Sequence, residues 1–279
     1  MKTGVFFHEI FARHSWPVVG NRFKNFPKAM ERELQLEKVD LFKPEKVSEE
    51  LLLKVHSREH LDRVKERWYY EGAAISVGGC IEASELVYDG KIENALVFNV
   101  AAGHHARHEN AWGGTYLSCT GPSIADLREK VRTGKKLRFA IIDTDSHHGD
   151  GTRSIFRWDK DVLHICFCSN SKMEDETKID VDVGFQTTDE AYLRKVEEEL
   201  PRIKAFHPEM IFHILGYDTC EGDYGDRGLT KDFFLKLVEL VRSCSIEACG
   251  GRYVIIIMGG SRGDIAEYIF PRMIRILAK

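Results

Sequence analysis

The sequence lacks the features of exported, membrane-spanning or disulfide-built proteins. Its longest purely apolar run, Tyr253–Met258, is too short to cross a bilayer, and charged residues interrupt the N-terminal segment, so we expect neither export nor membrane insertion. The 7 cysteines are odd in number and contain no C-x-x-C pair, which favours reduced thiols in a cytoplasmic protein. With only 7 prolines and no low-complexity tract, the chain is not expected to be disordered or fibrous.

An excess of one charge is also missing. The 40 Lys and Arg residues nearly balance 44 Asp and Glu residues, giving a net charge of −4, so direct nucleic-acid binding is not expected. With 43% hydrophobic residues and no internal repeat or linker, the sequence predicts that residues 1–279 form one globular domain.

Short apolar runs rich in β-branched residues alternate with stretches of helical periodicity. The predicted strands are Gly4–Phe7, Ala95–Val100, Leu137–Ile142, Val162–Phe167, Met210–Leu215 and Tyr253–Met258. The predicted helices are Ala29–Leu36, Glu59–Arg67, Ile75–Tyr88, Pro122–Val131, Asp189–Ala205, Lys231–Ala248 and Asp264–Leu277. Several strand runs lack in/out alternation, as strands covered on both faces do. This order predicts a three-layer α/β fold with a mostly parallel sheet.

Histidine and aspartate gather where four of the predicted strands end. The segments concerned are Gly103–Ala106, Asp143–Gly151, Gly216–Asp218 and Gly259–Asp264. Because ligands bind outside the carboxyl ends of the strands in such sheets, we expect these segments to meet at one edge.

Three of these side chains are suited to binding one metal ion. Asp145 and His147 lie two residues apart, so in an extended segment they point to the same side, and Asp218 approaches from another strand end. Two carboxylates, one imidazole and an open position suit a catalytic Zn²⁺, which acidifies water and polarises a carbonyl. The same donors also accept Fe²⁺.

The motifs resemble the zinc-dependent histone deacetylase family, which includes acetylpolyamine amidohydrolases and acetoin-utilisation proteins and has the arginase/deacetylase fold. The matching segments are Gly103-His104-His105-Ala106, Asp143-x-Asp145-x-His147-His148-Gly149-Asp150-Gly151 and Gly216-Tyr217-Asp218, with Val55-His56-Ser57, Gly78-Gly79 and Gly259-Gly260 as outer matches. They span nearly the whole chain in the order of the family.

The resemblance implies that Asp145, His147 and Asp218 bind zinc. It also implies that His104 and His105 are active-site imidazoles, hydrogen-bonded to Asp143 and Asp150 respectively. One imidazole then acts as general base and acid, and the other contributes electrostatically. The implied reaction removes an acyl group, most simply acetyl, from an acyl-lysine or a small acylated amine.

One departure from the family concerns the donor to the developing oxyanion. The Gly-rich turn of the family ends in a tyrosine, whereas this chain has Gly263 there, or Arg262 in a shifted alignment. Arg262 is therefore a candidate donor, with a tyrosine from elsewhere as the alternative. Losing one such donor costs about 10²–10³ in turnover. A metal-containing binding module with little turnover is accordingly the second hypothesis, and a binuclear Mn²⁺ ureohydrolase the third, although Cys220 replaces its second aspartate.

Two further departures concern the substrate tunnel and a second cation. Gly113-Gly114-Thr115 replaces a family phenylalanine, and the segment Cys168–Lys178 is short, so we expect a wider tunnel than in the family. Asp143 of the family's monovalent-cation site is retained, but Cys166 stands where serine is usual. Sulfur is a poor ligand for K⁺, so the sequence does not decide whether the chain keeps a K⁺ site.

Overall fold

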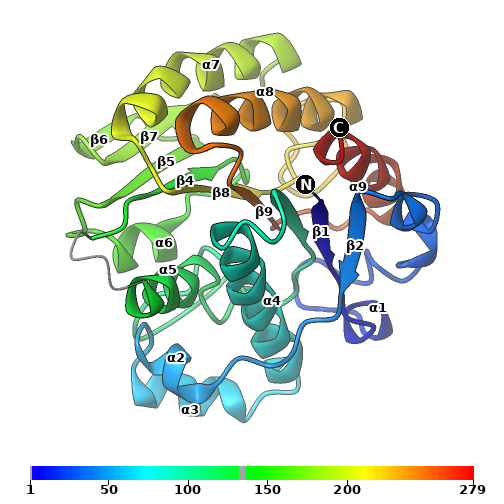
Figure 1. Ribbon diagram of the computed structural model, residues 1–279, viewed down its shortest axis with the longest axis vertical. Coiled ribbons are helices and arrows are strands. Elements are labelled where there is room, and N and C mark those ends of the chain that lie inside the picture. The colour runs from blue at the N-terminus through cyan, green and yellow to red at the C-terminus, as the bar shows by residue number, and fades with distance from the viewer. Residues whose placement is uncertain (1, 132–135) are drawn as a thin grey trace.

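The structure has one nine-stranded sheet whose order brings distant segments of the chain together (Figure 1). The computed structural model describes residues 2–131 and 136–279. From edge to edge the strands are β2 (Val39–Phe42), β1 (Thr3–Phe6), β3 (Asn94–Val97), β9 (Tyr253–Ile257), β8 (Met210–Leu215), β4 (Phe139–Asp143), β5 (Val162–Cys168), β7 (Lys178–Asp182) and β6 (Lys172–Asp175). All neighbouring pairs are parallel except β7 and β6.

Helices cover both faces of the sheet. In Figure 1, α7 (Asp189–Phe206) and α8 (Lys231–Cys249) lie above the sheet, with α9 (Gly263–Leu277) packed against α8, while α4 (Tyr70–Tyr88) and α5 (Thr120–Lys130) lie below it. The shorter helices are α1 (Ile10–Arg13), α2 (Glu49–Leu53), α3 (Arg58–Lys65) and α6 (Asp150–Ile155). The predicted three-layer α/β fold is confirmed. Within the described ranges, no helix combines the length and apolarity needed to span a bilayer.

The central strands explain why the sequence shows continuous apolar runs. Every residue of β4, β8 and β9 is buried, because helices cover both faces. Side-chain hydroxyls fix where the flanking helices begin: Thr188 Oγ1 accepts from the N–H of Ala191 in α7, and Thr230 Oγ1 accepts from that of Phe233 in α8. The six predicted strands and the six helices after the first correspond to elements of the structure, with ends shifted by a few residues.

The predicted helix Ala29–Leu36 is wrong. The segment instead forms two 3₁₀ turns, η1 (Lys28–Met30) and η2 (Glu33–Gln35). Glu33 is buried and paired with Arg275 of α9, with Oε1 2.6 Å from Nη2. Both turns pack against α9, and such tertiary contacts override the local periodicity that favoured one helix.

Candidate metal centre

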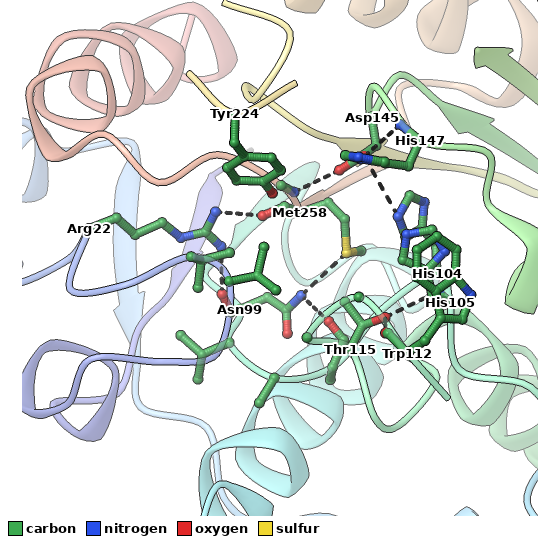
Figure 2. Close-up of a pocket in the computed structure, with 18 residues that line it drawn as sticks. Arg22, Asn99, His104, His105, Trp112, Thr115, Asp145, His147, Tyr224 and Met258 are labelled. Atoms are coloured by element: carbon green, nitrogen blue, oxygen red, sulfur yellow. Dashed lines mark hydrogen bonds and ion pairs between the residues drawn. The ribbon is translucent and has the colours of Figure 1, made fainter. Parts of the chain in front are cut away.

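Two carboxylates and one imidazole converge where β4 and β8 end. Asp145 and His147 follow β4, and Asp218 follows β8. Nδ1 of His147 lies 3.1 Å from Oδ1 of Asp145 and 3.2 Å from Oδ2 of Asp218, and the three ligand atoms lie within 4.8 Å of one another. Figure 2 shows Asp145 and His147 at the edge of a pocket. The structure therefore brings together the three predicted metal ligands.

The donor set fits a divalent cation. Both carboxylates are buried, and burial together with the charge of Asp145 raises the pKa of Asp218, a cost that a bound cation offsets. Protein groups hold the carboxylates in place: the Gly259 N–H donates to Oδ2 of Asp145 at 2.8 Å, and Ser146 Oγ donates to Oδ2 of Asp218 at 2.6 Å. Such outer partners are typical of metal ligands.

Each of the two neighbouring histidines is held by a carboxylate. Nδ1 of His104 lies 2.9 Å from Oδ2 of Asp143, and Nδ1 of His105 lies 2.6 Å from Oδ1 of Asp150. Burial opposes protonation of His104, but the carboxylates of Asp143 and Asp145 outweigh it and raise its pKa to about 9. Burial, and then the charge of His104, lower the pKa of His105. The two imidazoles therefore differ in charge near neutral pH.

Trp112 and Arg107 complete the surroundings of His105. The Trp112 ring lies 3.8 Å from that of His105 between centroids, and its Nε1 donates to Oδ2 of Asp150 at 3.0 Å. Arg107 Nε donates to the same oxygen at 2.8 Å. Gly113 has a φ of 61°, and a Cβ there would lie 2.5 Å from Cδ2 of His105. A side chain at Gly113 would therefore displace the imidazole.

Asp145, His147 and the histidine pair line a cavity of about 230 Å³ (Figure 2), whereas Asp218 is fully buried. The buried guanidinium of Arg22 also lines it and donates to the carbonyls of Met258 at 2.5 Å, Gly260 at 2.8 Å and Asn99 at 2.9 Å. Within the described residues no carboxylate pairs with Arg22. The cavity thus carries a fixed positive charge on the side away from the metal ligands.

Similarity to known proteins identifies the family of this chain. The sequence model of the histone deacetylase domain matches residues 17–277. The chain belongs to the histone deacetylase family. It is 27% identical to a probable deacetylase of Archaeoglobus fulgidus over 93% of this chain and 81% of that protein. It is 29% identical to a histone deacetylase-like amidohydrolase of Pseudomonas aeruginosa over 76% of this chain and 64% of that protein.

The fold of the family is also found among solved structures. The crystal structure of the HDA15 HD domain superposes with a TM-score of 0.86, covering 99% of this chain and 89% of that one at 20% identity. The predicted family and its arginase/deacetylase-like fold are therefore confirmed, and deacetylase or amidohydrolase activity is supported at the level of the family.

The predicted oxyanion donor Arg262 lies outside the cavity. Its guanidinium donates from Nε to Oδ1 of Asp264 at 3.0 Å and from Nη2 to Oδ2 at 2.9 Å, and it does not line the cavity. Its side chain is 42% exposed, because it sits at the N-terminus of α9 beside solvent. The structure therefore does not bring Arg262 to the metal ligands.

Tyr224 is the residue that the sequence reasoning missed. It lies on the loop after β8, and its hydroxyl reaches the same cavity, where it accepts from the Gly260 N–H at 3.0 Å (Figure 2). Its ring centroid lies 5.9 Å from that of His147. The one available signal was a tyrosine on the loop that begins with Asp218. Nothing in the spacing showed that this loop folds back over the ligands.

The structure also shows the surroundings of Cys166, the residue that replaces the usual serine of the family's monovalent-cation site. Cys166 lies beside Asp143, and its Sγ accepts from the Gly149 N–H at 3.4 Å. The ligand atoms of Asp143, His164 and Cys166 lie within 4.8 Å of one another. A K⁺ ion at this place stays a prediction.

Proposed function

We propose that this chain is a metal-dependent amidohydrolase that removes an acyl group, most simply acetyl, from an acyl-lysine or a small acylated amine. The metal is Zn²⁺, the usual occupant of catalytic sites with three protein ligands. The observation that carries the proposal is that one cavity is lined by Asp145 and His147, which group with the buried Asp218, and by a carboxylate-held histidine pair. The names of the relatives, deacetylase and amidohydrolase, support the same reaction.

The residues divide the chemistry between them. A divalent ion held by the three ligands supplies Lewis acidity toward a carbonyl and acidifies water. His105, with its lowered pKa, takes a proton from the attacking water and passes it to the leaving amine. His104 is hydrogen-bonded to the buried carboxylate of Asp143, which favours its protonated form, and it stabilises the negative charge that develops on the oxygens of the reacting carbon.

Tyr224 supplies the donor that the Gly-rich turn lacks. Because its hydroxyl oxygen accepts from the Gly260 N–H, its proton is free to be donated into the cavity. Burial, with the charges of Asp218 and Asp145, raises the pKa of Tyr224, so it stays a neutral phenol. The neighbouring Asp223 accepts from the Ser261 N–H at 2.9 Å and so ties this loop to the turn.

The substrate class follows from the cavity and its mouth. The inner cavity is about 230 Å³, which suits a short acyl group, and the charge of Arg22 suits a carboxylate product. A wider space of about 690 Å³ opens on the other side of Trp112, His147 and Tyr224, and Phe185 on its wall is 78% exposed. These aromatic side chains are suited to contact the aliphatic stem of a lysine or polyamine.

The two other hypotheses are less favoured. A binding module with little turnover was suggested by the missing oxyanion donor, which Tyr224 provides. A binuclear ureohydrolase needs a second bridging carboxylate, and the buried Cys220 stands in its place. One metal ion at this group is therefore the proposal.

Chelation and reconstitution test the proposed function. We expect metal-free protein to be inactive, and added Zn²⁺ or, without oxygen, Fe²⁺ to restore acyl release from a panel of acylated lysines, polyamines and aryl amides. The panel also ranks the acyl groups. No release from any substrate by protein that holds its metal would contradict the proposal and favour a binding module.

Replacing Tyr224 by phenylalanine should lower kcat by about 10²–10³, the effect of losing one oxyanion donor, with KM and metal content near those of the parent. The substitution keeps the ring beside His147 and removes only the hydroxyl. Steady-state kinetics on the best substrate of the panel, with metal analysis of the same sample, provide the measurement.

Two further variants serve as controls for the Tyr224→Phe result. Tyr268→Phe removes the hydroxyl of an exposed tyrosine that donates to Asp232, and we expect no change in kcat. Arg262→Ala tests the donor suggested by the shifted alignment. If Arg262→Ala carries the large loss and Tyr224→Phe does not, the assignment of Tyr224 is wrong.

A further inference from the structure

A second group of metal-binding side chains lies beside the first and shares no residue with it. Cys166 and Cys168 lie on β5, two residues apart, and their side chains meet Asp180 of the neighbouring strand β7. His148 joins them from the loop after β4, directly after His147 in the chain. One ligand atom from each of the four side chains lies within 4.8 Å of the others.

Two of the distances between these atoms are those expected in a tetrahedral site. Nδ1 of His148 lies 3.8 Å from Sγ of Cys168 and 3.4 Å from Oδ1 of Asp180. Zinc bonds to sulfur, nitrogen and oxygen place the corners of a tetrahedron roughly 3.3–3.8 Å apart. The other ligand atoms lie within 4.8 Å of one another, so small side-chain movements would close the set around one ion.

Burial and charge favour an ion over an empty cluster. Both cysteines are fully buried, and the side chain of Asp180 is 3% exposed. Two thiolates and a carboxylate carry three negative charges, which a divalent ion and the nearby guanidinium of Arg153 neutralise together. Nη2 of Arg153 donates to Oδ1 of Asp180 at 2.6 Å. Such a balance is what a desolvated set of charges requires.

The group is accessible to an ion. His148 is partly exposed and lines the open 690 Å³ space, so an ion has an entry path. A bound metal ion supplies the positive charge that favours deprotonation of both buried thiols.

We propose that His148, Cys166, Cys168 and Asp180 bind a second Zn²⁺ ion with a structural role. Four protein ligands leave no open coordination position, which is the pattern of structural sites. The ion ties the loop that carries His147 to β5 and β7 and so holds the first ligand group in place. The proposal does not depend on the proposed function, because it concerns metal binding alone.

Cobalt substitution distinguishes the two sites, because only the second contains sulfur. We expect the Co²⁺-loaded parent to bind two equivalents and to show a thiolate-to-cobalt charge-transfer band in the near ultraviolet. Asp218→Asn should lose one equivalent and keep the band, and this variant leaves all four proposed ligands unchanged. Cys168→Ser should lose the band and one equivalent, while the matched control Cys244→Ser, a buried cysteine of α8, should keep both.

Two results would overturn the second site. One is a parent that binds a single equivalent, lost in Asp218→Asn, with no thiolate band. The other is a disulfide between Cys166 and Cys168, detected as the loss of two hydrogens in the intact mass. We expect no such disulfide, because residues two apart on an extended strand are separated by about 6.6 Å between Cα atoms, close to the upper limit for a disulfide.

Discussion

Replacing Asp218 with asparagine should abolish metal binding at the catalytic group and reduce acyl release to the uncatalysed background. The side chain is fully buried and is one of the three predicted metal ligands. Asparagine keeps the size but not the charge, so two neutral groups and one carboxylate remain to hold a divalent ion. Metal analysis after dialysis and the acyl-release assay measure both effects on one sample.

Thermal unfolding with and without metal separates this loss from misfolding. Metal at 100 times its dissociation constant stabilises a folded protein by about 2.7 kcal/mol, and we expect the variant to lose this increment from its catalytic group. Without metal, the variant should be no less stable than the parent, because removing one of two close buried carboxylates relieves repulsion. Asp40→Asn, at an exposed ion pair with Lys2, is the matched control.

The strands that position this site were predictable because they are buried on both faces. In β4, β8 and β9 nearly every residue must be apolar, so the run itself predicts the strand. The strands that escaped prediction lie toward the edges of the sheet. β6, with the sequence Lys-Met-Glu-Asp, is mostly exposed, and only Val39 of β2 is buried. Edge strands with few buried residues lack the apolar run that predicts a central strand, so local composition does not reveal them.

The same distinction applies to the site. Asp145, His147 and Asp218 follow apolar strands directly, so sheet geometry alone brings them to one edge. Tyr224 depends on the fold of a loop, fixed by the hydrogen bonds of Asp223 to the turn after β9. The second group of metal-binding side chains depends on the pairing of β5 with β7, a strand that the sequence did not reveal.

Replacing His105 with alanine should lower kcat by about 10²–10⁴, the range for losing a general acid–base residue, while metal content stays unchanged. His105 is not among the three ligands, and its lowered pKa leaves it able to accept a proton near neutral pH. Added imidazole should restore part of the activity by occupying the space beside Trp112. His14→Ala, an exposed histidine whose ring packs against Trp16, should behave as the parent. Full activity of His105→Ala would instead make His104 the base, despite the two carboxylates that keep it protonated.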